Sequence, residues 1–207
     1  MTKQELRVLY KTRRLELSSN DLEERSQLIC ETVFKNFQLE GKQISLFLPI
    51  ERQKELNTYK ILEKGIAIGT NIALPKMDTD ENNLKHYQFE NHSQLKTNNW
   101  GIPEPQTGKL IKNKDLDYVF VPLLTLDSKG HRVGYGKGFY DRFLKKCRPD
   151  CIFIDHPPKG LSNCERQNGR QTLHTNRQTL HAMAARLHRG HKSTICLCRK
   201  YLFFAFY

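Results

Sequence analysis

The chain has 207 residues and a formal net charge of +12, which is room for one α/β domain with a core, alone or with an appended segment. It contains no apolar run of membrane-spanning length, and its first residues lack the apolar core of a signal peptide, so we expect a cytoplasmic protein without a membrane partner. The six cysteines form no CxxC pair, which is typical of reduced thiols in that compartment. The charge predicts an anionic partner, either a nucleotide, a nucleic acid or another polyanion.

The positive charge is concentrated towards the C-terminus. Residues 155–207 hold nine lysines and arginines against two acidic residues, whereas residues 1–154 hold 25 against 20. A mildly basic body suits a phosphate-bearing small molecule better than a nucleic acid. The composition therefore divides the chain into a domain over residues 1–154 and an atypical basic tail over residues 155–207.

The first predicted element is a helix over residues 3–17, where Leu and Val recur with helical spacing among Lys, Arg and Glu. Lys3 and Arg7 are four residues apart, so both project from one face near its start. Two such side chains are either solvated surface charges or a pair that binds an anion. Residues 18–21 then interrupt the helical pattern.

A second helix is predicted up to about residue 37. Asn20 and Glu23 have the spacing of a capping box, which satisfies free backbone N–H groups at a helix start. The apolar residues that follow recur with helical spacing and predict a core-facing stripe, formed by Leu22, Leu28, Ile29, Val33, Phe34 and Phe37. The stripe predicts packing and no chemistry.

A short apolar segment, residues 43–48, predicts a buried strand that ends at Pro49. The polar segment 51–58 follows at the carboxyl end of this strand, the edge at which open α/β sheets bind their ligands. Thr58 can cap the next helix, which is predicted over residues 59–68.

Further strands are predicted over residues 71–75 and 84–89, and the second alternates as an edge-proximal strand does. Segment 99–105 holds two prolines and a glycine, which should exclude regular structure and place Trp100 on a stiff extended loop. An exposed aromatic ring on such a loop can stack on a flat heterocycle, or it can fold back onto its own domain.

A glycine-rich segment, Arg132-Val-Gly-Tyr-Gly-Lys-Gly-Phe-Tyr-Asp-Arg142, follows a predicted strand over residues 117–126 and precedes a predicted helix over residues 139–146. Such a loop lets backbone N–H groups converge on an anion. Lys137 would add a positive charge for a phosphate, and Asp141 could hold the accompanying Mg²⁺. The spacing fits neither the Walker pattern nor the dinucleotide fingerprint, so a turn that only permits close packing is the alternative.

Residues 151–154 predict one more strand. The order of helices and short apolar strands along residues 1–154 indicates an α/β sandwich built around a mainly parallel sheet.

Four motifs together resemble the 5-formyltetrahydrofolate cyclo-ligase (5,10-methenyltetrahydrofolate synthetase) family over about residues 1–154. They are Lys3-x-x-x-Arg7, Glu55-Leu-Asn-Thr58, Trp100-Gly-Ile-Pro-Glu-Pro105, and the glycine-rich segment with Val121-Pro122, Asp127 and Gly130 before it. The resemblance implies a three-layer α/β/α sandwich. It also implies an ATP- and Mg²⁺-dependent ligase that converts 5-formyltetrahydrofolate to 5,10-methenyltetrahydrofolate with release of ADP and phosphate.

The same resemblance implies roles for individual residues. ATP would contact Lys3, Arg7, Arg132, Val133, Gly134, Tyr135, Gly136, Lys137, Gly138, Phe139 and Tyr140. The metal would be held by Asp141, and the folate by Leu48, Glu55 and Trp100. Lys137 and Tyr140 would act in catalysis, with Tyr140 at the junction of the two ligands. Read from position alone, Leu48 is equally a core residue and Glu55 a surface carboxylate. We expect a monomer whose partners are these two small molecules.

The tail does not continue the family pattern. Members of the family continue with further strands and a second metal-binding aspartate, and the tail has no counterpart to either; instead, Arg170-Gln-Thr-Leu-His174 recurs at residues 177–181. Either the reading frame shifts after about Ile154 or the tail is a genuine basic appendage. A third interpretation is a metal site formed by His188, His191, Cys196 and Cys198, although its Cys-x-Cys spacing is unusual for zinc.

Two other functions stay open beside the ligase. A chain without the second aspartate could bind folate or nucleotide without turnover. A nucleic-acid-binding protein would use the basic tail, and its affinity would fall steeply with salt. That tail lacks any recognisable nucleic-acid module.

Overall fold

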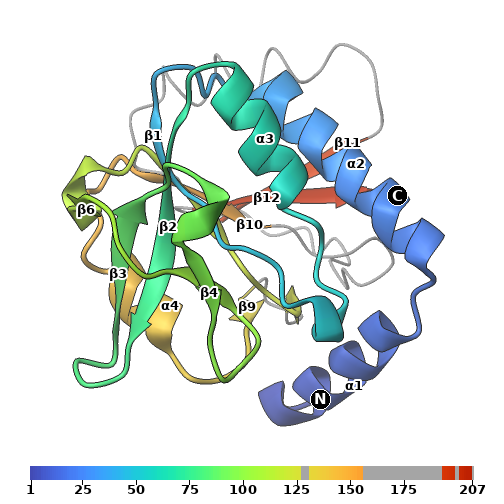
Figure 1. The fold of residues 1–207 in the computed structure, drawn as a ribbon. Coiled ribbons are helices and arrows are strands. Elements are labelled where there is room, and N and C mark those ends of the chain that lie inside the picture. The colour runs from blue at the N-terminus through green and yellow to red at the C-terminus, as the bar shows by residue number, and fades with distance from the viewer. Residues whose placement is uncertain (127–130, 156–192, 199–200, 207) are drawn as a thin grey trace.

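The computed structural model describes residues 1–126, 131–155, 193–198 and 201–206 (Figure 1). The helices are α1 (Lys3–Leu15), α2 (Ser19–Asn36), α3 (Tyr59–Ala67) and α4 (Phe139–Leu144), with short 3₁₀ turns η1 (Glu51–Gln53), η2 (His92–Gln94) and η3 (Asn113–Asp115). The strands are β1 (Gln43–Ser45), β2 (Asn71–Asp78), β3 (Asn83–Gln88), β4 (Leu95–Thr97), β5 (Pro103–Pro105), β6 (Leu110–Ile111), β7 (Tyr118–Val121), β8 (Thr125–Leu126), β9 (Arg132–Val133), β10 (Ile152–Asp155), β11 (Ser193–Cys198) and β12 (Tyr201–Phe206). None of the helices within the described ranges is long and apolar enough to cross a membrane.

One mixed sheet organises the fold, with strand order β11-β12-β10-β7-β1-β2-β3-β6. The neighbours from β12 through β10, β7 and β1 to β2 are parallel, and the three outer pairings are antiparallel. Strand β1 lies between two parallel partners, because Ile44 is opposite Ile72 on one side and Tyr118 on the other. The predicted mainly parallel sheet is confirmed. The expectation that the tail supplies no further strands is wrong, because β11 and β12 lie within residues 155–207 and β12 pairs with β10.

Helices cover the two faces of this sheet. On one face, α2 and α3 lie next to each other and bury apolar side chains against β1, β2 and β7 (Figure 1). On the other face, Phe143 of α4 is fully buried among residues of β7 and β10. Strand β7 serves both cores, since Tyr118 faces the α2–α3 side and Val119 the α4 side. The predicted three-layer α/β/α sandwich is confirmed.

The predicted start of α2 is wrong. The N-cap is Ser18, whose Oγ accepts from the backbone N–H of Asp21 at 3.0 Å, while the Asp21 carboxylate accepts from the Ser18 N–H at 3.3 Å. The Asn20–Glu23 pair has the right spacing, but the chain turns two residues earlier. Leu28 is also misplaced in the core stripe, because it is 40 % exposed and the buried face runs through Ser26, Ile29, Cys30 and Val33.

The start of α3 and the end of β1 also differ from the prediction. Thr58 does precede α3, but its hydroxyl donates to the carbonyl of Phe47 at 2.6 Å instead of capping the helix. Strand β1 ends at Ser45, earlier than predicted, although Leu46 and Leu48 beyond it are buried. Buried residues thus extend beyond the strand as far as the polar segment 51–58.

Proline shapes two regions that the sequence pattern described incorrectly. The predicted strand 117–126 is two strands, β7 and β8, because the chain leaves the sheet at Pro122, which has no N–H to donate. Strand β8 then pairs with β9 in an antiparallel ribbon that leads into the glycine-rich segment. Conversely, Pro103–Pro105 is a short strand paired with Leu95–Thr97, as proline permits at an edge.

His86 makes the core sensitive to acid. Its ring is fully buried, stacks on Phe143 with a centroid distance of 4.4 Å, and places Nε2 2.9 Å from Ser45 Oγ. Burial lowers the pKa of His86 from 6.5 to about 3. Between pH 6.5 and 3, His86 is protonated in the unfolded chain but stays neutral in the folded chain. The contribution of His86 to the free energy of unfolding is therefore complete above pH 6.5 and falls as the pH drops through this window, by up to about 5 kcal/mol.

We expect urea unfolding at pH 7, 5 and 4 to show this loss, and a His86→Gln variant to show a flatter pH dependence. His92→Gln is the matched control, since His92 is exposed. Equal pH dependence in the wild type and His86→Gln would contradict the assignment.

Candidate active site

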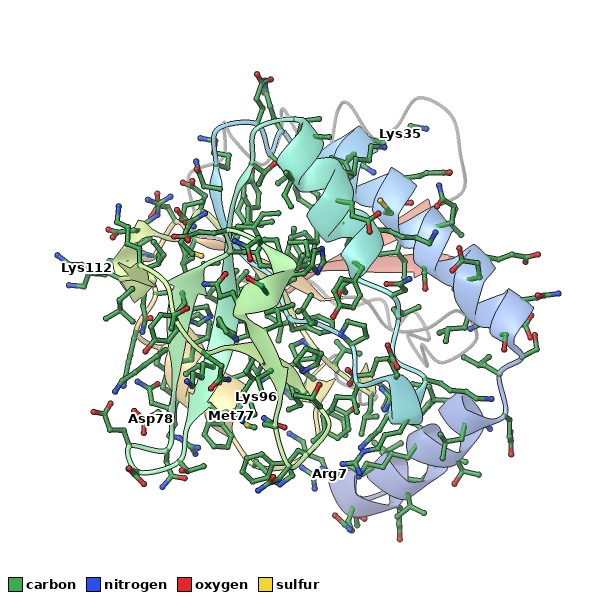
Figure 2. All side chains as sticks on the ribbon, viewed as in Figure 1. Arg7, Lys35, Met77, Asp78, Lys96 and Lys112 are labelled. Carbon is green, nitrogen blue, oxygen red and sulfur yellow. The ribbon has the colours of Figure 1, made fainter. Side chains whose placement is uncertain are left out.

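A cavity of about 520 Å³ opens at the carboxyl ends of the parallel strands β1 and β7. It is enclosed by α1, the segment after β1, the end of β2, the turn before β5 and the glycine-rich segment. Figure 2 shows two of its lining side chains, Arg7 from α1 and Met77 from β2, which come from separate parts of the fold. This is the edge at which the sequence predicted a ligand site.

The cavity brings together fourteen of the fifteen predicted site residues. They are Lys3, Arg7, Leu48, Glu55, Trp100, Arg132, Gly134, Tyr135, Gly136, Lys137, Gly138, Phe139, Tyr140 and Asp141. The exception is Val133, whose side chain is fully buried with Leu6, Tyr10 and Leu124. Alternation along β9 explains the difference, because it directs Arg132 to the cavity and Val133 to the core. Any contact of Val133 with a ligand is thus limited to its backbone.

The glycine-rich segment needs glycine at two positions. Gly136 has φ +98° and Gly138 has φ +73°, a region that residues with a Cβ rarely adopt. A Cβ at Gly136 would lie 3.1 Å from Cζ of Arg7, whose Nε donates to the carbonyl of Gly134 at 2.9 Å. Arg7 therefore joins α1 to the segment and lies directly against its backbone. The interpretation of Lys3 and Arg7 as two solvated surface charges is therefore wrong for Arg7.

Basic side chains dominate the mouth of the cavity. Lys137 Nζ lies 4.2 Å from the centroid of the Trp100 ring, and Arg52 donates to the Trp100 carbonyl at 2.6 Å. Arg132 forms an ion pair with Asp141, whose side chain is 70 % exposed. Trp100 is 39 % exposed, so it does not fold back into its own domain. An anion with a flat aromatic group would meet positive charge and a stacking surface at one place.

Glu55 is a buried carboxylate, so its interpretation as a surface residue is wrong. It is 7 % exposed, accepts from the backbone N–H of Ile50 at 2.8 Å, and accepts from the hydroxyl of Tyr135. Nη1 of Arg14 lies 3.7 Å from the same carboxylate. Burial raises the pKa of Glu55, and the Tyr135, Ile50 and Arg14 groups oppose that rise. Burial also raises the pKa of Tyr135, which keeps the phenol protonated as a donor.

Leu48 is a core residue that also reaches the cavity. It is 3 % exposed within the α2–α3 core, and it also lines the cavity wall.

Sequence reasoning missed several residues of the site. Lys11 lines the cavity beside Lys3 and Arg7, and Arg14 lies behind it against Glu55. A signal was present, because positions 3, 7, 11 and 14 share one face of a helix. Glu104 was also missed, although it lies inside the tryptophan motif; it is 5 % exposed and accepts from the Met77 N–H at 2.9 Å.

Some predictions fall on residues outside the described ranges. Asp127 and Gly130, and His188 and His191 of the proposed tail metal site, lie there. Within the part of the chain that the structure describes, no group of three or more His, Cys, Asp or Glu side chains is placed to hold a metal ion. Cys30, Cys147 and Cys151 are free thiols.

The fold and the cavity define a class: a three-layer α/β protein with a basic cavity at the carboxyl ends of its parallel strands. A family model described as the 5-formyltetrahydrofolate cyclo-ligase family matches residues 1–161. The match spans well over half of the chain, and the chain therefore belongs to the 5-formyltetrahydrofolate cyclo-ligase family. Residues 162–207 lie outside it.

Curated relatives agree with this membership. The chain is 29% identical to the 5-formyltetrahydrofolate cyclo-ligase of Mus musculus over 153 residues, which cover 70% of this chain and 74% of the mouse protein. It is 30% identical to the Haemophilus influenzae protein of the same name over 144 residues, covering 66% and 72%.

Two solved structures are similar in fold. The NMR structure of Aquifex aeolicus 5,10-methenyltetrahydrofolate synthetase has a TM-score of 0.67 at 23% identity, covering 83% of this chain and 86% of that one. A 5,10-methenyltetrahydrofolate synthetase from Mycoplasma pneumoniae has a TM-score of 0.59 at 20% identity, covering 76% and 85%. These likenesses show the α/β fold with its mixed, mainly parallel sheet flanked by helices.

Proposed function

We propose that this protein is an ATP- and Mg²⁺-dependent cyclo-ligase that converts 5-formyltetrahydrofolate to 5,10-methenyltetrahydrofolate and releases ADP and phosphate. The observation that carries the proposal is the meeting, in one cavity, of the basic glycine-rich segment with Glu55 and Trp100. Family membership supports the same substrate and the use of ATP.

The reaction explains why such a cavity needs little acid–base apparatus. The oxygen of the formyl group attached to N5 is a poor leaving group. Transfer of the γ-phosphoryl group of ATP to that oxygen makes it part of a phosphate ester, with ADP as the other product. N10 then attacks the formyl carbon, the C–O bond breaks to release phosphate, and N10 loses its proton as the ring closes. Positioning and electrostatic stabilisation are the demands on the protein.

The phosphate end of the cavity fits this demand. The N–H groups of the segment from Gly134 to Gly138 and the ammonium of Lys137 would bind the phosphates of ATP, with Lys3, Arg7 and Arg132 adding positive charge. The close approach of Arg7 to Gly136 leaves a backbone surface that a Cβ would fill. Asp141 is an exposed oxygen donor on the cavity wall, which is the ligand type that Mg²⁺ prefers. Mg²⁺ would supply charge neutralisation at the phosphates.

The other end of the cavity fits a folate. The Glu55 carboxylate can accept from the N–H donors of a pterin, which is a charge-assisted contact inside a desolvated site. Trp100 offers an aromatic face and Leu48 an apolar wall. Tyr140 lines the cavity next to Asp141 and would lie where the two ligands meet.

The test is the formation of the methenyl-folate chromophore from 5-formyltetrahydrofolate by the full chain, with and without Mg·ATP. We expect ATP-dependent product, and a loss of roughly 10²- to 10³-fold in Asp141→Ala, because the oxygen ligand that would hold Mg²⁺ beside the phosphates is gone. Asp80→Ala is the matched control, since Asp80 is exposed in the β2–β3 turn. A folded chain that binds 5-formyltetrahydrofolate but forms no product would instead establish a binder without turnover.

A further inference from the structure

Arg14 is a buried charge to which the proposed reaction gives no role. It lies in the last turn of α1 with 6 % of its surface exposed, and it does not line the 520 Å³ cavity. A guanidinium removed from water costs free energy unless it is paired and hydrogen-bonded. The hydrogen-bond and ion-pair partners of Arg14 therefore indicate its role.

Three polar groups surround Arg14. Its Nη2 donates to the Tyr135 hydroxyl at 2.6 Å and to Gln53 Oε1 at 3.2 Å, and its Nη1 lies 3.7 Å from Glu55 Oε1. Tyr135 donates in turn to Glu55. One guanidinium thus ties together α1, the segment after β1 and the glycine-rich segment, which are far apart in sequence.

We propose that Arg14 is a positioning residue, which holds Glu55 as an oriented carboxylate for the folate, both directly and through Tyr135. This role rests on the proposed function, since Glu55 is its folate ligand. Arg14 touches neither ligand and acts through Glu55 and Tyr135.

Arg14 supplies the positive charge among the groups that lower the pKa of Glu55, and Lys11 and Arg52 line the same cavity as the carboxylate. The groups that lower the pKa of Glu55 are the Tyr135 hydroxyl, the Ile50 N–H and the Arg14 charge, and burial opposes them. The elements behind the carboxylate, α2, α3, β7 and β10, contribute apolar side chains and the hydroxyl of Thr58, which is already bonded to Phe47. Without Arg14, the protonated form of Glu55 gains at the expense of the carboxylate.

The alternative is that Arg14 only fastens α1 to the domain. A fastening role predicts a loss of stability and a fall in kcat and affinity that does not depend on pH. A positioning role predicts a loss that is confined to the folate and that alkaline pH repairs, because raising the pH restores the carboxylate.

The experiment compares Arg14→Gln with Arg13→Gln, whose arginine is the exposed neighbour on the same helix. We expect Arg14→Gln to raise the KM for 5-formyltetrahydrofolate about tenfold at pH 7, with a shrinking difference towards pH 9 and less than about twofold change in kcat or in the KM for ATP. Arg14→Lys keeps the charge and should recover the wild-type pH profile. Arg13→Gln should match the wild type. A pH-independent effect, or equal behaviour of the two glutamine variants, would overturn the proposal.

A ligand-free measurement separates this inference from the proposed function. The pH dependence of unfolding, compared between chains with Glu55 and with Glu55→Gln, reports the titration of Glu55. In the Arg14→Gln background that titration should move to higher pH. If the wild type shows no turnover but the Glu55 titration moves in Arg14→Gln, the proposed cyclo-ligase activity is refuted and the interaction of Arg14 with Glu55 is supported. If the Glu55 titration does not move, the interaction is refuted whatever the activity.

Discussion

Replacing Lys137 with alanine is expected to lower kcat/KM for ATP by about 10²- to 10³-fold, the usual cost of one preorganised electrostatic contact to the transition state. Lys137 is the lysine between the two left-handed glycines, Gly136 and Gly138, so its backbone is held where its side chain enters the cavity. Its ammonium lies over the Trp100 ring at 4.2 Å. Steady-state kinetics with varied ATP at saturating 5-formyltetrahydrofolate measures the effect.

Lys145→Ala is the control, because Lys145 is an exposed lysine just after α4 and does not line the cavity. Lys137→Arg tests whether charge alone suffices, and we expect partial activity since the bulkier guanidinium must share the space beside Trp100. Should Lys137→Ala keep the kinetics of Lys145→Ala, the phosphate role of the glycine-rich segment would be refuted.

The position of Lys137 also links the two ends of the cavity. The same ammonium that would bind phosphate packs on the indole that would stack on the folate, and Arg52 donates a hydrogen bond to the Trp100 carbonyl. Arg132 shows a similar pairing, because it holds the carboxylate of Asp141. Both basic residues are thus stabilised by groups of the proposed folate and metal sites.

The architecture was predictable because its signals are local. Apolar segments of strand length alternate with helical patterns, and these patterns located α1 to α4 and the central strands. The errors lie where tertiary contacts decide. Ser18 and Asn20 are both competent N-caps, and the path of the chain out of α1 selects Ser18. A proline pattern excludes a central strand, but it does not exclude the edge position that Pro103–Pro105 takes.

The site was predictable where one segment or motif contains it, as in the glycine-rich segment. It was not predictable where three segments meet. The environment of Glu55 depends on Arg14, 41 positions earlier, and on Tyr135, 80 positions later. Nothing in the local sequence indicates that a glutamate in a polar run is buried. One sequence signal could have placed Lys11 and Arg14 near the site, namely their helical spacing from Lys3 and Arg7.

Glu55→Gln is expected to weaken 5-formyltetrahydrofolate binding by roughly 10- to 100-fold, because an amide replaces the charged acceptor of a buried hydrogen bond. The effect depends on pH. Burial raises the pKa of Glu55 above 4.5, so wild-type affinity should rise as the pH increases through that raised pKa, and the glutamine variant should lack this rise. Quenching of Trp100, the sole tryptophan, measures binding at each pH.

Stability should change with the opposite sign. Above pH 4.5 the unfolded chain releases the Glu55 proton while the folded chain still holds it, so this residue makes wild-type stability fall with rising pH up to its raised pKa. The stability of Glu55→Gln relative to the wild type should therefore improve across that window, while its folate affinity deteriorates. Glu51→Gln, an exposed glutamate four residues earlier, should change neither quantity. Only a buried, functional carboxylate produces both trends together, because the burial that costs stability is what strengthens its contact with a ligand.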